Sequence, residues 1–438
     1  MATSANAIPR QRWIRIIPVA FIMYTFAFVD RNNIGFGIPG IEKTFSIGAT
    51  VAGLVAGLFF VGYVFLQIPG GQLAMKWSAK RYIFFSLIVW GCLATLTGFV
   101  QNLPELLIVR FLLGVAEGGV WPATLVLIAR WFPIEERGRA NSYWIACTPV
   151  AGIITPLISG WILTWTDWRT LFILEGILPL IWAVVWWLLI DDTPDTAKWI
   201  SPAERDYINS RFNATIERIP QTTRNTWADA LKNGLVWWLV AAYFLLQVGT
   251  YGISLWLPVI VKNLTKQGFG MVGVLVALPS VAGLIGIYIN SNHSDRTGER
   301  KVHAGLAALL AGVALLVSAL VGTSSVVIAI LFLIVAQGFL SSYTGIFWTL
   351  PPLFVGKASL GSSMGLINAL GNLGGFLGPY LIGYLFTMTG SNKIGLMTLA
   401  AALAGAGLLT VFFRYGSRSD TGAAVAAGAS EAPATRLV

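Results

Sequence analysis

The sequence predicts an all-α membrane protein whose twelve transmembrane helices form two pseudo-symmetric six-helix bundles. Composition, a series of long apolar segments and an internal repeat support this prediction. Of the 438 residues, 56% are hydrophobic and only 11% are charged. A soluble domain carries about 25% charged residues. The 18 tryptophans also suit a bilayer, because indoles anchor helices at its interfaces.

A helix that crosses a bilayer needs about 20 mostly apolar residues. The chain contains twelve such segments. They are residues 15–37, 48–74, 82–100, 104–130, 139–164, 169–190, 235–261, 271–291, 303–322, 325–349, 359–387 and 392–413.

The polar stretch 191–234 contains Pro194, Pro202 and Pro220 and separates the sixth apolar segment from the seventh. It predicts a cytoplasmic linker between an N-terminal bundle, residues 1–190, and a C-terminal bundle, residues 235–416. The tail 417–438 is rich in Ala, Gly and Ser, a composition typical of disorder.

The basic residues predict how the chain lies in the membrane. Most of the 29 Lys and Arg residues fall in the connections that share one side with the N-terminus. By the positive-inside rule both termini are then cytoplasmic. This placement explains the net charge of +10 without a nucleic-acid partner. The N-terminus has no cleavable signal pattern.

The sequence gives little support to an enzymatic reading. Cys92 and Cys147 lack the spacing of a metal site, and no Gly-rich phosphate loop or nucleophile–base motif is visible. We therefore expect no enzymatic activity, no metal and no organic cofactor.

Four charged residues lie inside the apolar segments: Asp30, Arg31, Arg110 and Glu117. Each would cost ~2.5–3.5 kcal/mol at the centre of a membrane helix if it were unpaired. Such charges persist when they pair, face water or carry function. They therefore mark the candidate site.

Helix geometry places these charges near one another. At 1.5 Å per residue, Asp30 and Arg110 lie at similar depth in antiparallel segments, which predicts a pair between them. Arg110, Glu117 and Trp121 fall within roughly 20° of one helix face. A face with two charges and an indole is expected to line a central cavity.

The two halves repeat a short loop. Residues 71–81 follow the second span and residues 291–301 follow the eighth, and each loop combines basic residues with a tight turn. Two such halves imply a pseudo-two-fold arrangement with a site between them. We assign a gating role to five loop residues: Lys76, Arg81, Asp295, Arg296 and Arg300.

With these features the chain resembles a major facilitator superfamily transporter. The loops resemble that superfamily's cytoplasmic gate motif, although Met75 stands where the first copy should have an acid. Asp30-Arg31, Gly62-Tyr63, the Trp131-Phe132-Pro133 segment and the pair Asn368 and Asn372 resemble the anion:cation symporters, particularly bacterial sugar-acid:proton symporters. This resemblance implies a protein of the bacterial inner membrane that works as a monomer.

The charges have distinct expected roles. Arg31 is the anchor for a substrate carboxylate, because a guanidinium binds a carboxylate in a bidentate way. Arg110 is the switchable partner of Asp30. Asp30 and Glu117 carry protons, and the sequence does not say which is the main carrier. The alternative is a static ion-pair network that never titrates.

Polar and aromatic residues within the spans suit a hydroxylated ligand, since each substrate hydroxyl needs a new partner when it loses water. The candidates for substrate contact are Tyr63, Trp121, Tyr251, Asn368 and Asn372, together with the cations Arg31 and Arg110. Thr148 stands where some sugar-acid permeases carry a longer amide.

The leading hypothesis is a proton-coupled importer of an organic anion, most simply a sugar acid such as an aldonate, that works by alternating access. Three alternatives stay open. In the first, the protein is a symporter of an aromatic carboxylate. In the second, it exports drugs or metabolites. In the third, it is a sensor that binds a carboxylate without transporting it.

Overall fold

The computed structural model describes residues 10–218, 227–355 and 359–412, and every regular element in these ranges is a helix. The predicted tail 417–438 lies outside the described residues. The elements of the N-terminal half and the linker are α1 (Gln11–Phe45), α2 (Ala49–Lys76), α3 (Ala79–Thr97), α4 (Leu103–Gly118), α5 (Val120–Trp131), α6 (Ile134–Ile145), α7 (Cys147–Trp165), α8 (Trp168–Leu189), α9 (Pro202–Arg218) and α10 (Trp227–Lys232). Those of the C-terminal half are α11 (Gly234–Thr265), α12 (Phe269–Thr297), α13 (Lys301–Val321), the 3₁₀ turn η1 (Gly322–Ser324), α14 (Val326–Phe347), α15 (Pro351–Phe354), α16 (Leu360–Asn372), α17 (Gly374–Thr389) and α18 (Asn392–Val411).

Eleven helical segments of the described chain are long and apolar enough to cross a membrane. They match eleven of the twelve predicted spans. The remaining span, 359–387, is formed by α16 and α17, which have 13 and 16 residues and are separated only by Leu373. Neither is long enough to cross a membrane alone, but the two follow one another. The predicted all-α membrane fold is confirmed.

Two further spans are also pairs of helices. The span 104–130 consists of α4 and α5 and breaks at Gly119, and the span 139–164 consists of α6 and α7 and breaks at Ala146. At the first break, a Cβ on Gly118 would lie 2.2 Å from the carbonyl oxygen of Tyr63. The lack of a side chain at Gly118 lets α4 approach the backbone of α2. The apolar pattern of the sequence does not reveal the helix break at Gly119.

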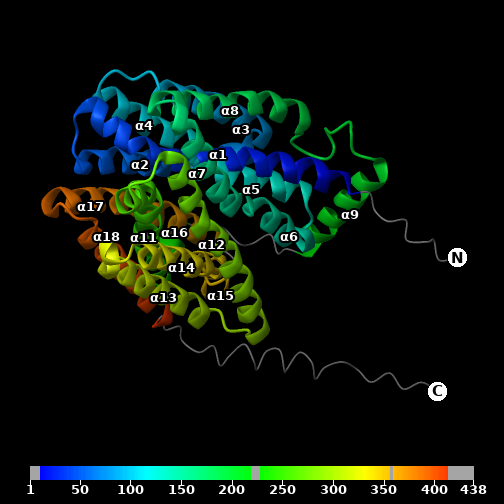
Figure 1. The fold of residues 1–438 in the computed structure, drawn as a ribbon. Coiled ribbons are helices and arrows are strands. Elements are labelled where there is room, and N and C mark those ends of the chain that lie inside the picture. Colours follow the sequence, from blue (N-terminus) through cyan, green and yellow to red (C-terminus); the bar gives the residue numbers. More distant parts are fainter. Residues whose placement is uncertain (1–9, 219–226, 356–358, 413–438) are drawn as a thin grey trace, which may run out of the picture.

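The two halves repeat the same packing. In the N-terminal half α2 packs on α4, α3 on α8, and α1 on both α7 and α8. In the C-terminal half the equivalent pairs are α12 with α14, α13 with α18, and α11 with α17 and α18. Figure 1 shows the first group lying against the second, with α2 beside α17. This structural repeat corresponds to the repeated loops 71–81 and 291–301 in the sequence.

Glycines bring the halves together at the ends of the helices remote from the linker. A Cβ on Gly53 of α2 would lie 2.5 Å from the carbonyl oxygen of Pro379 in α17. A Cβ on Gly383 of α17 would lie 2.1 Å from the carbonyl oxygen of Ala49. On the other side of the molecule Gly160 of α7 meets Gly273 of α12. Small residues of this kind allow membrane helices to pack backbone to backbone.

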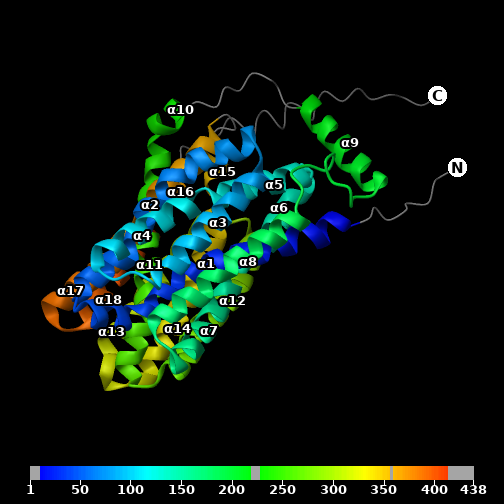
Figure 2. The same cartoon turned by 90° about the horizontal axis from the view of Figure 1, so that it is seen from above.

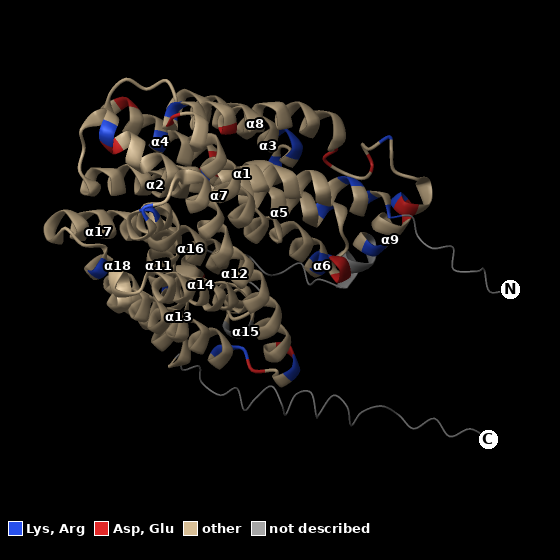
Figure 3. Ribbon diagram, viewed as in Figure 1, with Lys and Arg blue, Asp and Glu red and all other residues tan. Residues whose placement is uncertain are grey.

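Charged residues concentrate at the helix ends and in α9, and few lie in the middle of the bundles (Figure 3). The linker helix α9 lies beside α6 and the first turns of α1 (Figure 2). Arg12 of α1 joins them, because its guanidinium binds Glu204 of α9 at 2.5 Å and Glu136 of α6 at 2.7 Å. Arg12 is 2% exposed and Glu204 is fully buried.

The first gate loop is held together without an acid at residue 75. Arg130 at the end of α5 donates hydrogen bonds to the backbone carbonyls of Ala74 and Met75. It also pairs with Asp192, which follows α8, at 2.5 Å. The other oxygen of Asp192 accepts from the backbone amide of Lys80 at 3.0 Å. An acid from the linker therefore joins the start of α3 to the ends of α2 and α5.

The Arg12 contacts predict a measurable loss of stability. Arg12→Gln would leave Glu204 as a buried carboxylate without its cation, and such a break costs roughly 3–5 kcal/mol. We expect a clear drop in the unfolding temperature of the purified protein. Arg10→Gln is the control, because Arg10 is exposed at the start of α1. Equal unfolding temperatures for the two variants would contradict the proposed role of this ion pair.

Candidate functional site

A buried ion pair lies at the centre of the N-terminal half. A terminal nitrogen of Arg31 in α1 donates to Glu117 Oε2 in α4 at 3.0 Å. The two residues are 3% and 1% exposed. Glu117 Oε1 and Arg31 Nε have no hydrogen-bond partner in the described structure. The pair therefore retains donors and acceptors that another group could use.

Asp30 and Arg110 lie beside this pair but are not bonded to each other. Asp30 Oδ2 accepts a hydrogen bond from the indole of Trp90 in α3 at 3.1 Å. None of the three guanidinium nitrogens of Arg110 has a hydrogen-bond partner among the described residues. Arg110 still interacts through its charge with both Asp30 and Glu117. The sequence predicted an Asp30–Arg110 pair, whereas the structure pairs Glu117 with Arg31.

These four residues form a compact cluster of opposite charges. Asp30 and Arg31 come from consecutive positions of α1, and Arg110 and Glu117 are two turns apart in α4. All four are at most 3% exposed. With all four groups ionised, the formal charges of the two carboxylates and two guanidiniums sum to zero. A neutral cluster avoids the large cost of an uncompensated charge in a medium of low dielectric constant.

Aromatic rings surround Arg31. Its guanidinium carbon lies 4.6 Å from the ring centre of Tyr63, 5.0 Å from that of Phe28 and 5.3 Å from that of Phe59. Cations are attracted to such ring faces. These contacts hold the guanidinium in place without using its hydrogen-bond donors.

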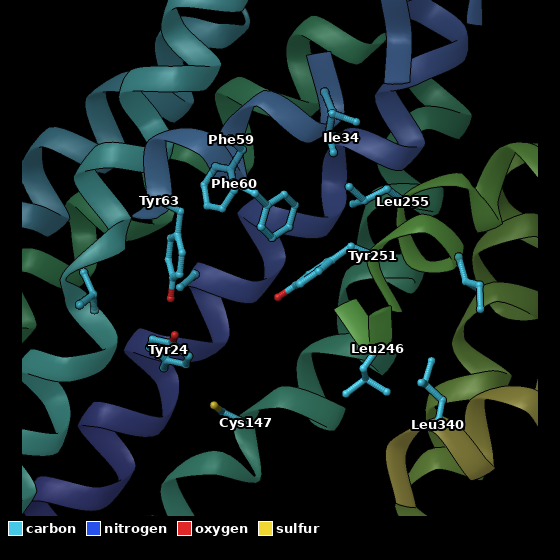
Figure 4. Close-up of a cluster of buried hydrophobic side chains, with 14 of the residues drawn as sticks. Tyr24, Ile34, Phe59, Phe60, Tyr63, Cys147, Leu246, Tyr251, Leu255 and Leu340 are labelled. Atoms are coloured by element: carbon cyan, nitrogen blue, oxygen red, sulfur yellow. The ribbon is translucent and has the colours of Figure 1, made fainter. Parts of the chain in front are cut away.

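The C-terminal half reaches this cluster through Tyr251 of α11. Its ring packs on Phe60 of α2 with 4.1 Å between the ring centres. Tyr251 and Tyr63 also interact electrostatically with Arg31. Figure 4 shows the hydroxyls of Tyr24 and Tyr63 facing each other, while the Tyr251 ring reaches from α11 toward α2. The predicted contact residues Tyr63 and Tyr251 therefore come together from opposite halves.

Asn368 and Asn372 belong to a chain of four amides. Asn368 of α16 donates to the side-chain oxygen of Gln67 in α2 at 2.7 Å. Asn372 donates to Asn368 Oδ1 at 3.0 Å and accepts from Gln247 of α11 at 3.0 Å. The chain links the halves on the linker side of Tyr251. In this conformation the amides bind one another.

Trp121 lies in the first turn of α5, after the break at Gly119. Its ring packs against Tyr24 at 5.2 Å and against Trp144 at 4.6 Å between ring centres. The residue is partly exposed, whereas Trp144 is fully buried. Trp121 is thus part of an aromatic cluster next to the charged residues.

The comparisons with known proteins identify the family. A family model described as the Major Facilitator Superfamily matches residues 20–379. A protein named putative tartrate transporter from Agrobacterium vitis is 32% identical over 418 residues, which cover 93% of this chain and 91% of that protein. A protein named quinolone resistance transporter from Acinetobacter baumannii is 31% identical and covers 92% of this chain and 93% of the relative.

The chain belongs to the major facilitator superfamily. It is a multi-pass membrane transporter and not an enzyme. A solved structure of a bacterial homologue of the human lysosomal transporter Spinster, in an inward-facing and occupied conformation, matches with a TM-score of 0.68. The match covers 92% of this chain and 95% of that one, at 16% identity. It supports the fold alone.

The predicted gate residues of this major facilitator protein lie at the linker ends of α2, α3 and α12. Asp295 pairs with Arg300 inside the second loop, and Arg296 is exposed beside them at the end of α12. In the first loop Lys76 is the last residue of α2. The backbone amide of Arg81 donates to the Ser78 hydroxyl at 3.1 Å, and this bond caps α3.

The sequence analysis missed three buried polar residues next to the cluster. Trp90 donates to Asp30, Asn33 lies one turn further along α1, and Glu175 lies in the middle of α8. Glu175 could have been found by the same signal that identified Glu117, since it is a carboxylate within an apolar span. Trp90 could not, because tryptophans are frequent throughout this chain.

The bond from Trp90 to Asp30 predicts a stability effect. Trp90→Phe keeps an aromatic ring but leaves Asp30 without its hydrogen bond, which costs about 1–3 kcal/mol for a buried acceptor. We expect a lower unfolding temperature than for Trp161→Phe, because Trp161 is 66% exposed.

A double-variant cycle isolates the hydrogen bond from the loss of ring volume. In an Asp30→Asn background, Trp90→Phe is expected to cost less than in the wild type, because the acceptor has lost its charge. An equal cost in both backgrounds would mean that the indole acts only by packing.

Proposed function

We propose that this transporter is a proton-coupled symporter that imports an organic anion across the bacterial inner membrane by alternating access, with both termini in the cytoplasm. The favoured substrate is a sugar acid such as an aldonate. The observation that carries the proposal is the buried Arg31–Glu117 pair of the N-terminal half, which Tyr251 of the C-terminal half reaches.

The Arg31–Glu117 pair gives a physical reason why substrate binding and proton binding would be coupled. A substrate carboxylate that binds Arg31 competes with Glu117 for the same guanidinium. The four-residue cluster is neutral before the substrate arrives, so the anion adds an uncompensated negative charge. A proton on Glu117 restores neutrality and frees Arg31 at the same time. Asp30, which has no bonded cation, is the second proton carrier in this proposal.

Hydroxyl and amide groups around Arg31 favour a hydroxylated acid. Tyr63 and Tyr251 offer hydroxyls from opposite halves, and the Gln67–Asn368–Asn372–Gln247 chain offers amides that can exchange partners. A site with many polar groups rejects apolar ligands, because these would leave buried donors and acceptors unpaired. The relative named for tartrate, a hydroxylated dicarboxylate, agrees with this choice.

The Trp121 cluster favours a second candidate, an aromatic carboxylate. An exposed part of the Trp121 ring could stack on an aromatic substrate. Its contacts with Tyr24 and Trp144 equally suit a purely packing role. We therefore rank the sugar acid first.

Uptake measurements separate these candidates from export and from sensing. Purified protein in liposomes, with an acidic outside, is offered labelled aldonates, uronates, aldarates and aromatic acids. The proposal expects uptake of a hydroxylated acid that collapses when the proton gradient is removed. An exporter would instead expel a drug such as a quinolone, as the name of one relative suggests for that protein. A sensor would bind an acid without moving it.

Arg31→Lys tests the anchor. Lysine keeps the positive charge but loses the planar fork that binds a carboxylate through two parallel hydrogen bonds. We expect the dissociation constant of the transported acid to rise tenfold or more, measured by calorimetry. Arg10→Lys serves as the control because Arg10 is exposed at the start of α1. Unchanged affinity in Arg31→Lys would exclude Arg31 as the bidentate anchor.

Glu117→Gln tests proton coupling. The amide cannot ionise, so Arg31 stays available but no proton can be released at this position. We expect counterflow of substrate to persist while accumulation driven by a proton gradient is lost. Glu105→Gln is a matched control at the exposed start of the same helix, α4. Continued accumulation against a gradient by Glu117→Gln would remove Glu117 from the coupling mechanism.

A further inference from the structure

Glu175 is a buried carboxylate to which the proposed mechanism gives no role. It lies in α8 and is 2% exposed. Helix α8 runs antiparallel to α1, because Phe172 packs against Gly37 while the Trp182 indole donates to the carbonyl of Val19. Glu175 is therefore level with Asn33, one turn of α1 away from Asp30. It extends the charged cluster in the direction away from the linker.

Among the described residues, the contacts of Glu175 are polar but include no cation. Its Oε1 accepts a hydrogen bond from the Ser159 hydroxyl of α7 at 2.7 Å. Its other partners are the Asn33 side chain and, through charge, Asp30. Helix α7 has no charged residue, and the cations of α3 are Lys80 and Arg81 at its far end. The Lys80 carbonyl binds the Trp186 indole, about three turns of α8 from Glu175.

Four buried polar atoms beside the cluster are without a hydrogen-bond partner among the residues that the structure describes. They are Asp30 Oδ1, both amide atoms of Asn33, and Glu175 Oε2. The Asn33 side chain interacts with both Asp30 and Glu175. A proton on Glu175 would complete a hydrogen-bond chain, since Glu175 Oε2–H can donate to Asn33 Oδ1 while Asn33 Nδ2–H donates to Asp30 Oδ1. If both carboxylates were ionised, the NH₂ group of Asn33 could donate to each of them, but the buried Asn33 Oδ1 would be left without a donor.

The charge balance of the buried groups also favours a protonated Glu175. Asp30, Arg31, Arg110 and Glu117 are neutral as a set, so an ionised Glu175 would give the buried group a net charge of −1. A buried carboxylate without a cation is more stable in its neutral form.

We propose that Glu175 is a third proton-binding carboxyl of this transporter, protonated in this conformation and coupled to Asp30 through Asn33. Its role in transport rests on the proton coupling proposed above, but its protonation can be tested without any substrate.

Infrared spectroscopy of the purified full-length protein provides the test. A protonated buried carboxyl gives a C=O band that an ionised one lacks. We expect a band at pH 7 that Glu175→Gln removes and Ser159→Ala shifts in frequency. Glu105→Gln should leave it unchanged, because that carboxyl lies at the exposed end of α4. Asp30→Asn removes a neighbouring negative charge, so Glu175 should ionise more easily and its band should disappear at lower pH than in the wild type.

Two results would overturn the inference: a wild-type spectrum in which Glu175→Gln removes no band, or a titration of that band that Asp30→Asn does not move. If Glu175→Gln does not fold, the Ser159→Ala frequency shift and the Asp30→Asn titration decide the matter. Failure of the proposed function looks different. In that case the wild type would take up no acid with protons although the Glu175 band behaves as expected.

Discussion

The ion pair between Arg31 and Glu117 is the interaction on which the rest of this transporter's site depends. In a medium of low dielectric constant, a charge that loses its partner must find another or be neutralised. Arg31 has aromatic rings on several sides and a single carboxylate partner. In the proposed mechanism, an anion that binds Arg31 displaces Glu117 from it and favours a proton on that carboxylate. Substrate binding and proton binding are then coupled through one guanidinium.

The surrounding fold connects the cluster to the second half of the molecule. The cluster belongs to the N-terminal half, while Tyr251 and the amides of α16 and α11 belong to the other half. At the ends remote from the linker, the halves meet through glycines and backbone carbonyls of α2 and α17 and through the Thr50 and Thr387 hydroxyls. Small residues of this kind let the bundles pack backbone to backbone, and the proposed alternating access requires the bundles to move against each other.

The sequence predicted the helices and the location of the site because both follow from the cost of placing charge in lipid. Apolar length identified the spans, and the four charged residues within them identified the cluster. The sequence could not assign partners, because helix depth and facing place Asp30, Arg110 and Glu117 together without fixing side-chain directions. It therefore predicted an Asp30–Arg110 pair where Glu117 binds Arg31. It also missed the breaks at Gly119 and Ala146, the first of which lies where glycines bring α4 close to α2.

The linker acid at the first gate loop has a consequence for how such chains are recognised. Asp192 is more than a hundred residues away from Met75 in sequence, yet it binds Arg130 and the first turn of α3. A pattern search that requires an acidic residue at position 75 would score this loop as defective. In three dimensions an acid from the linker lies beside this loop, so an ion pair at the predicted gate does not require an acidic residue at position 75.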